Sequence, residues 1–438
     1  MLTGRVFDPA EALSLGLILE VVDSKTLVER AVAKAREIAC HATLAVWMTN
    51  RRSSSRELTE FCNRSESLNE YATTPGPLDE YPIHQVPLPM ARAATSDRNF
   101  YDRCYLNAHD RDGGTFLIAG LGTYPNLGVV DGFITVRRGD RQRVVRFSDA
   151  LVDRGLEQHV GGIRLEVSEP LKRLRLVCEH EDLSADLTWT GAFPAVLEQP
   201  HVMHLGARPI LDARRFAQVG SWEGEFRVDG VDIAVDPAVW TGTRDRSWGI
   251  RPVGEAEPPG RAASEPGEGL WWLYVPLRFP DFAVVVILQE LPDGRRTLND
   301  AQRVWPDGRV EQLGWPRIDI EYRSGTRHPE RARIDLTTPD GKPLSIDIDT
   351  GTFIALHVGC GYGGDPDWQH GQWKGRQWSS STRYDLAAPD IAARIPFGAI
   401  DHVAHARCGD DDGWGLFELA SVGRHDPSGF AGFGSVAP

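Results

Sequence analysis

The stretch Ala332-Arg-Ile-Asp-Leu-Thr-Thr-Pro-Asp-Gly-Lys-Pro-Leu-Ser-Ile-Asp-Ile348 alternates apolar and polar side chains on both sides of an Asp-Gly pair. Such alternation places one face of a strand against an apolar core and the other face in water. Asp-Gly is also a preferred pair for the tight turn of a β-hairpin. The stretch therefore predicts two antiparallel strands joined at Asp340 and Gly341.

The same pattern extends in both directions from this hairpin, beginning near residue 96. Residues 282–288 are continuously apolar, which predicts a strand that is covered on both faces. Repeated antiparallel strands without helices favour sandwiches or closed barrels, and about 340 residues are too many for one small barrel. We therefore predict a mainly β protein with two barrels. Further Asp-Gly pairs, each a predicted turn, stand at 112–113, 131–132, 229–230, 293–294, 307–308 and 412–413.

The first 95 residues differ from the rest. Residues 1–50 show the 3.6-residue period of helices, and Thr74-Pro75-Gly76-Pro77 begins a proline-rich run that is typical of a linker. We predict a helical segment at 1–70 and a linker at 71–95. Two β domains follow, at 96–220 and 221–438.

Composition excludes several classes of partner. The net charge of −14 argues against non-specific nucleic-acid binding, and no apolar run approaches the roughly 20 residues that span a bilayer. The N-terminus lacks a basic region followed by an apolar core, so we expect no signal peptide. The six cysteines are scattered and lack metal-ligand spacing, which is typical of reduced thiols. We expect a cytoplasmic protein with no metal site, and its oligomeric state stays open.

The stretch Trp240-Thr-Gly-Thr-Arg-Asp-Arg-Ser-Trp-Gly249 concentrates charged and aromatic residues. The glycines that bracket it predict a tight loop at the mouth of a strand. The tryptophans Trp271 and Trp272 follow shortly afterwards. A carboxyl group among aromatic rings is a candidate proton donor, because burial in an apolar site raises its pKa. Asp245 is therefore the first candidate for acid chemistry.

Two parts of the chain resemble known families. Leu2-Thr3-Gly4-Arg5, Ala10-Glu11-Ala12, Leu15-Gly16-Leu17 and Glu20-Val21-Val22 resemble the C-terminal part of the crotonase (enoyl-CoA hydratase/isomerase) family. That resemblance covers residues 1–70 and implies a helical fragment. The family's oxyanion hole and catalytic glutamates lie upstream of this part, so crotonase-type hydratase activity is not expected.

The second resemblance covers residues 96–430. It rests on motifs at 115–125, 218–224, 244–249, 271–272 and 415–419. These resemble the lipocalin-like superfamily that includes carotenoid 1,2-hydratases (hydroxyneurosporene synthases), AttH-like proteins and Diels–Alderases. The resemblance implies two lipocalin-like antiparallel β-barrel domains. It also implies an apolar isoprenoid, steroid or polyketide-like substrate, with hydration, cyclisation or isomerisation at a carbon–carbon double bond.

Acid-catalysed addition to an alkene needs a proton donor, a base for water and a surface that stabilises positive charge. We expect Asp245 to donate the proton, with His370 or Glu418 assisting as acid or base. Aromatic faces stabilise cations by about 1–2 kcal/mol each when they are desolvated. This scheme requires no cofactor. The candidate substrate contacts are Arg244, Arg246, Trp248, Trp271, Trp272 and Trp373.

Each of these residues also has a purely structural interpretation. Arg244 and Arg246 flank Asp245, and a neighbouring arginine lowers the pKa of a carboxyl group, so Asp245 is equally a candidate structural ion-pair partner. Trp271 and Trp272 are adjacent, so on a strand at most one of them faces a given cavity. In the alternative interpretation, the same barrels form a non-catalytic lipid- or terpenoid-binding protein. The sequence leaves both interpretations open.

Overall fold

The computed structural model describes residues 92–438 except 112, 153–155, 206–207, 258–267 and 397, together with residues 23, 25, 26 and 30. The chain divides into two compact units, 1–75 and 76–438, and both β-sheets belong to the second unit. The predicted helical segment at 1–70 and nearly all of the linker at 71–95 lie outside the described residues. No described helix is long and apolar enough to cross a membrane.

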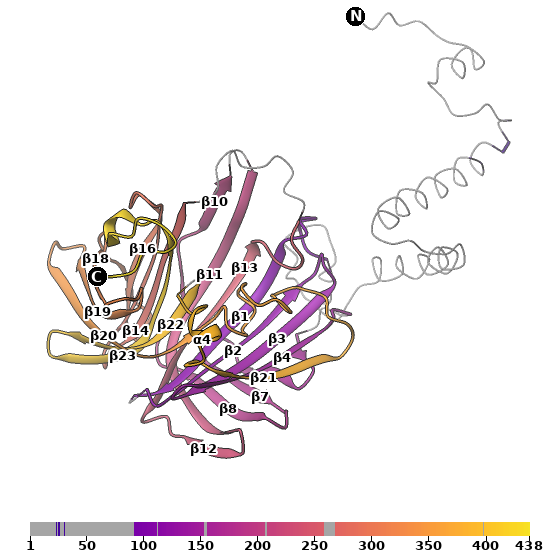
Figure 1. The fold of residues 1–438 in the computed structure, drawn as a ribbon, viewed down its shortest axis with the longest axis horizontal. Coiled ribbons are helices and arrows are strands. Elements are labelled where there is room, and N and C mark those ends of the chain that lie inside the picture. Colours follow the sequence, from indigo (N-terminus) through magenta and orange to yellow (C-terminus); the bar gives the residue numbers. More distant parts are fainter. Residues whose placement is uncertain are drawn as a thin grey trace, which may run out of the picture. The chain divides into compact units, whose positions relative to one another are not determined.

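The first sheet is antiparallel, and it curls into a half-barrel (Figure 1). Three short strands, β9 (Val196–Leu197), β10 (His201–Leu205) and β12 (Val231–Val235), pair with β11 beside the main path. The main path runs in the order β21 (Trp378–Asp385), β4 (Arg141–Ala150), β3 (Val129–Arg138), β2 (Thr115–Tyr124), β1 (Phe100–Asp110), β13 (Trp240–Ile250), β11 (Arg208–Val228), β8 (Leu183–Gly191), β7 (Arg173–Cys178), β6 (Ile163–Glu169) and β5 (Gln158–Val160).

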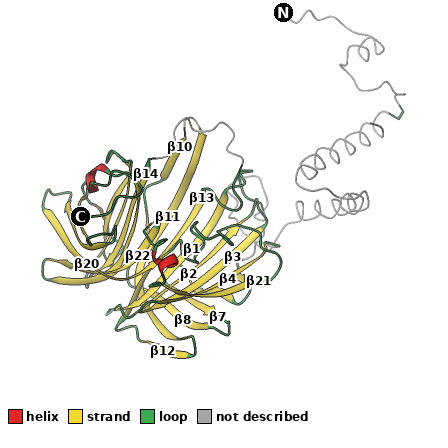
Figure 2. Ribbon diagram, viewed as in Figure 1, coloured by secondary structure: helices red, strands yellow, loops and turns green. Residues whose placement is uncertain are grey.

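The second sheet is a nine-stranded antiparallel half-barrel. Its order is β17 (Val310–Gln312), β16 (Arg296–Val304), β15 (Ala283–Glu290), β14 (Gly269–Arg278), β23 (Asp411–Gly423), β22 (Ala399–Cys408), β20 (Pro343–Ala355), β19 (Pro329–Thr337) and β18 (Arg317–Tyr322). The described helices are short: α4 (Pro389–Ala392) and the 3₁₀ helix η3 (Asp426–Ser428) (Figure 2). The prediction of a mainly β protein with lipocalin-like sheets is confirmed.

The predicted hairpin at 332–348 is confirmed in its register. Ile334 pairs with Ile346 across β19 and β20, and both side chains are fully buried. Gly341 has φ +82, a left-handed conformation that glycine adopts without steric cost. The apolar run at 282–288 forms most of β15, whose side chains are buried on both faces, as predicted.

Two of the predicted turns are wrong. The pairs 131–132 and 412–413 lie within β3 and β23. Asp131 is fully buried in β3, where its carboxylate binds Arg103, so tertiary packing overrides the turn preference. The stretch 240–249 is also not a loop: it forms β13, between β1 and β11 in the first sheet.

The border between the two sheets lies between β13 and β14, and not at residue 220. Strand β11 continues across residue 220, and β21 returns from residues 378–385 to pair with β4. The three largest apolar clusters of the described residues form layers. One layer fills the curl of each sheet, and the third lies between the sheets, where Tyr105 and Ala217 of the first meet Tyr274 and Leu416 of the second.

Candidate active site

A cavity of about 410 Å³ lies between the two sheets. Strand β13 packs against β23 there, and β11 packs against β14. The lining therefore comes from strands that are far apart in the sequence. Its residues are Tyr101, Arg103, Tyr105, His201, Met203, Ile210, Leu211, Arg215, Asp245, Ser247, Arg251, Pro252, Leu270, Trp272, Gln289, Tyr362, Ala399, Glu418 and Ala420.

Strand alternation explains which residues face the cavity. In the first sheet, Asp245 is paired with Tyr105 on one side and Ala217 on the other, so these side chains share a face. In the second sheet, Glu418 is paired with Tyr274 and Asp401. The packing of β13 on β23 brings the faces of Asp245 and Glu418 together.

Asp245 is a buried acid without a hydrogen-bond partner among the described residues. It is 9% exposed, and its carboxyl group makes no hydrogen bond with any residue that the structure describes. Burial raises its pKa to about 6, against the opposing charge of Arg215. The flanking arginines point to the opposite face, where Arg244 binds Gln218 and Arg246 binds Asp102. The adjacent ion pair that the sequence suggested for Asp245 is not formed.

Glu418 is the second acid in the cavity. Trp272 Nε1 donates a hydrogen bond of 2.8 Å to Glu418 Oε1. Burial raises the pKa of Glu418 to about 7; Arg215 opposes this rise and the charge of Asp245 adds to it. The ionised form of Asp245 therefore makes Glu418 hold its proton more tightly.

A third carboxyl group lies behind Glu418, on the neighbouring strand β22. Asp401 is fully buried, and the Tyr105 hydroxyl donates a hydrogen bond to its Oδ2 atom. Burial and the charge of Glu418 raise the pKa of Asp401 well above its ordinary value. Asp401 does not line the cavity, and its hydrogen bond supports Tyr105, which does.

Arg215 brings positive charge to the acid pair. Its Nε donates to Glu198 Oε2 at 2.8 Å, and its guanidinium lies over the rings of Trp272 and Tyr274, at 5.1 and 4.9 Å from their centroids. His201 stacks on the same Trp272 ring at 5.4 Å. These neighbours fix the ring of Trp272 and hold a cation beside both acids.

The other predicted residues lie elsewhere. Trp271 faces the core inside the second sheet and stacks on His425, while Trp248 lies on the face of β13 opposite to Asp245. Trp373 is 45% exposed and does not line the cavity. His370 is buried against Phe133 and Tyr362, and its Nε2 donates to the carbonyl oxygen of Cys360 at 2.7 Å. Within the described structure His370 holds a loop, and it does not reach the cavity.

Comparison with protein families assigns most of the chain to one family. The model of a family of unknown function, DUF8625, matches residues 76–431. The chain belongs to this family. No curated protein matches the chain in sequence. The DUF8625 match begins after the segment at 1–70, and the crotonase resemblance of that segment is not supported.

Solved structures give more distant likenesses. An AttH-like protein of Nitrosomonas europaea is 13% identical, with 78% of this chain and 98% of that chain covered and a TM-score of 0.46. Kievitone hydratase of Nectria haematococca is 13% identical, over 80% and 96% of the two chains, with a TM-score of 0.43. CghA is 12% identical, over 75% and 89%, with a TM-score of 0.44. Likenesses this distant say nothing about the chemistry of this chain.

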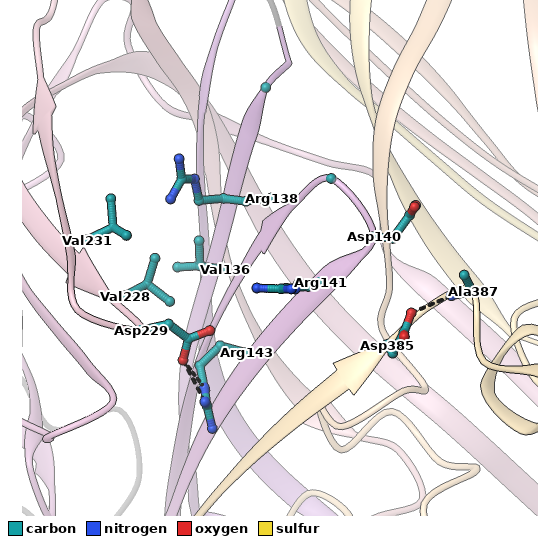
Figure 3. Close-up of a pocket in the computed structure, with 12 residues that line it drawn as sticks. Val136, Arg138, Asp140, Arg141, Arg143, Val228, Asp229, Val231, Asp385 and Ala387 are labelled. Carbon is teal, nitrogen blue, oxygen red and sulfur yellow. Dashed lines mark hydrogen bonds and ion pairs between the residues drawn. The ribbon is translucent and has the colours of Figure 1, made fainter.

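A second hollow, of about 750 Å³, lies beside the β3–β4 hairpin and the turn before β12 (Figure 3). Arg138 and Arg141 extend from the hairpin, and Arg143 Nε donates to Asp229 Oδ1 at 2.7 Å. These charged groups lie at the surface. This hollow lacks the pair of buried acids, so the cavity between the sheets is the candidate active site of this DUF8625 protein.

Sequence analysis missed Arg215, Tyr105 and Asp401. The signal for Arg215 was present, because it alternates with Ala217 and Val219 on a face that is otherwise apolar. A charged residue in register with such a face points toward the interior. The effect of its charge on Glu418 could not be predicted from the sequence, because it depends on how the two sheets pack.

Proposed function

We propose that this protein is an enzyme that moves protons at a carbon–carbon double bond of an apolar small molecule. The observation that carries the proposal is the pair Asp245 and Glu418. They come from different sheets, face one cavity of about 410 Å³ and have raised pKa values of about 6 and 7. Hydration, cyclisation and isomerisation of a double bond all need an acid and a base at the same site.

The two raised pKa values provide both forms in one pH range. Between pH 6 and pH 7 each group is partly protonated, so a fraction of the molecules has Asp245 neutral and Glu418 ionised. Trp272 donates a hydrogen bond to Glu418, which favours its ionised form. Asp245 has no such donor among the described residues. We propose that the reactive form is the less populated one, in which Asp245 is the proton donor and Glu418 is the base.

Hydration, isomerisation and cyclisation then begin with the same proton transfer and differ only in the step that follows it. Asp245 gives its proton to one carbon of the double bond. In hydration, Glu418 removes a proton from the water that adds to the other carbon. In isomerisation, Glu418 removes a proton from a neighbouring carbon, and in cyclisation a ring bond forms before that proton leaves. Solvent then returns the proton from Glu418 to Asp245.

The rest of the lining favours an apolar ligand. Met203, Ile210, Leu211 and Leu270 supply aliphatic surface, and Trp272 supplies an aromatic face. A volume of about 410 Å³ lies within the range of sites for small organic ligands, roughly 300–1,000 Å³. We propose isoprenoid, steroid or polyketide-like alkenes as substrates.

Catalysis explains the buried acids better than transport does. A carboxyl group that ionises only above pH 6 is less stable in the folded protein than in water, because burial disfavours its charge. A lipid carrier gains nothing from placing two such groups in its cavity. An enzyme gains a proton donor and an acceptor that operate near neutral pH.

The test uses the full chain incubated with a panel of terpenoid, steroid and polyketide alkenes in deuterated water. Asp245→Asn and Glu418→Gln are the test variants, and Glu225→Gln, an exposed glutamate, is the control. We expect a product with one added water, or an isomer carrying carbon-bound deuterium, from the parent and the control only. Mass spectrometry detects either product.

Two results would contradict the proposal. Ligands that bind unchanged to the parent and to every variant would favour a carrier. Equal turnover by folded Asp245→Asn and by the parent would remove Asp245 from the chemistry.

A further inference from the structure

Resting on the proposed acid–base site, we infer that Arg215 binds the carbonyl oxygen of a substrate whose double bond is conjugated to that carbonyl. The reaction then passes through an enolate held by the guanidinium. This narrows the substrate class from apolar alkenes in general to apolar α,β-unsaturated ketones, aldehydes and related carbonyl compounds.

The first observation is the free end of Arg215. Its Nε binds Glu198, whereas its two terminal nitrogens make no hydrogen bond with any described residue. These nitrogens are not sealed in the core: the side chain is 18% exposed and lines the cavity. Although burial opposes its charge, Glu198 and Asp245 raise the pKa of Arg215, so the guanidinium stays protonated.

The second observation concerns the aromatic faces. A carbocation intermediate would need an aromatic face to lie against, as the sequence suggested for Trp272. The guanidinium of Arg215 already lies over Trp272 and over Tyr274. A second positive charge beside it is repelled, whereas negative charge that develops on an oxygen is stabilised. The cavity therefore suits an anionic intermediate.

Hydration illustrates the balanced step. Water forms a C–O bond at the β carbon and gives its proton to the Glu418 carboxylate. The electrons of the double bond move onto the carbonyl oxygen, which becomes an enolate oxygen held by Arg215. The enolate then collapses as the α carbon takes the proton of Asp245. One water is added, and no oxidant or reductant takes part.

The lining contains two other arginines, and Arg103 fits this role less well than Arg215. Arg103 is 2% exposed, and its NH1 is bound by Tyr124 and Asp131, while its remaining nitrogens are sealed from the cavity. Arg251 stacks on Tyr101 at 4.4 Å and makes no side-chain hydrogen bond within the described ranges. It is therefore the competing candidate for the oxyanion contact, and the experiment below compares the two.

The first experiment measures whether Arg215 binds an oxyanion, with a probe that does not react. 4-Nitrophenol is the probe, because its phenolate absorbs visible light and its neutral form does not. At a fixed pH near 6, the preference for bound phenolate over bound phenol is compared between variants. We expect Arg215→Gln to reduce this preference by about tenfold, as the loss of a charge-assisted hydrogen bond predicts. Arg251→Gln should reduce it less than Arg215→Gln does, and Arg138→Gln, in the exposed turn of the β3–β4 hairpin, is the control that should leave it unchanged.

Arg215→Gln leaves Glu198 without its partner, so Glu198→Gln/Arg215→Gln is the second variant, in which both charges are absent. Circular dichroism and the melting temperature establish that each variant is folded. An unchanged preference in the folded double variant would overturn the inference. A loss confined to Arg251→Gln would also overturn it.

The second experiment uses citral, which carries one double bond conjugated to its aldehyde and one isolated double bond, beside geraniol, which lacks the aldehyde. We expect addition or deuterium incorporation at the conjugated position of citral and none in geraniol. Equal reaction of isolated double bonds, unaffected by Arg215→Gln, would overturn the enolate assignment while the acid–base function stood. Failure of every alkene would remove the proposed function, and the nitrophenol measurement would still decide whether Arg215 binds an oxyanion.

Discussion

Replacing Asp245 by asparagine should stabilise the protein at neutral pH. Asparagine has nearly the same shape as a protonated aspartate and cannot ionise. Burial raises the pKa of Asp245 from 3.8 to about 6 in the folded protein. A group whose pKa is raised on folding binds its proton more tightly in the folded state, so stability is highest below the unfolded pKa and falls as pH rises toward the folded pKa.

The size of the effect follows from the shift. A rise from 3.8 to about 6, at about 1.4 kcal/mol per pKa unit, corresponds to about 3 kcal/mol. Asp245→Asn should therefore match the parent near pH 4 and exceed its free energy of unfolding by up to about 3 kcal/mol above pH 7. The difference should grow mainly between pH 4 and pH 6.

Urea unfolding at a series of pH values between 4.5 and 7.5 measures this difference, with tryptophan fluorescence as the signal. Asp281→Asn, an exposed aspartate in the turn between β14 and β15, is the control and should show no such gain. If Asp245 were a structural ion-pair partner, its asparagine variant would be less stable than the parent at pH 7.5. That result would refute the reasoning.

Three further substitutions test other parts of the structure. Trp272→Phe removes the N–H that donates to Glu418, so the pKa of Glu418, the higher of the two, should rise and the basic limb of the pH–rate profile should move up by about one unit; an unmoved limb would remove Glu418 from the proton transfers. Tyr105→Phe leaves Asp401 Oδ2 without its donor and should cost about 1–3 kcal/mol in urea unfolding. Tyr101→Phe, whose hydroxyl has no partner in the described structure, should cost much less, and equal losses would contradict the contact. Gly341→Val should cost about 1–2 kcal/mol, because φ +82 strains a residue with a Cβ although nothing lies within 4 Å of that Cβ; an unchanged urea midpoint would contradict it.

The strand pattern of this protein was predictable because it is local. Alternation at 332–348 fixed a hairpin and its register, and the apolar run at 282–288 identified a strand covered on both faces. The same local logic failed for Asp131 and for the stretch 240–249. There, a buried arginine and two neighbouring strands outweigh the preferences of Asp-Gly pairs and bracketing glycines.

The candidate site was also predictable only in part. The sequence alone indicated Asp245, Glu418 and Trp272 by residue type and motif order, and these three line one cavity. It did not separate them from Trp271, Trp373 or His370, which carry the same chemical groups and lie elsewhere. The side-chain type is written in the sequence, whereas the face to which each strand turns depends on its neighbours.

The sequence by itself determined that this is a mainly β protein with an acid set among aromatic residues. Only the tertiary structure decided that Arg244 and Arg246 turn away from Asp245, and that Arg215 and Glu418 arrive from other strands. The physical reason is the distance along the chain over which each effect acts. Alternation and turn geometry act over a few residues, while the pKa of a buried acid is set by burial and by charges that the packing of two sheets brings together.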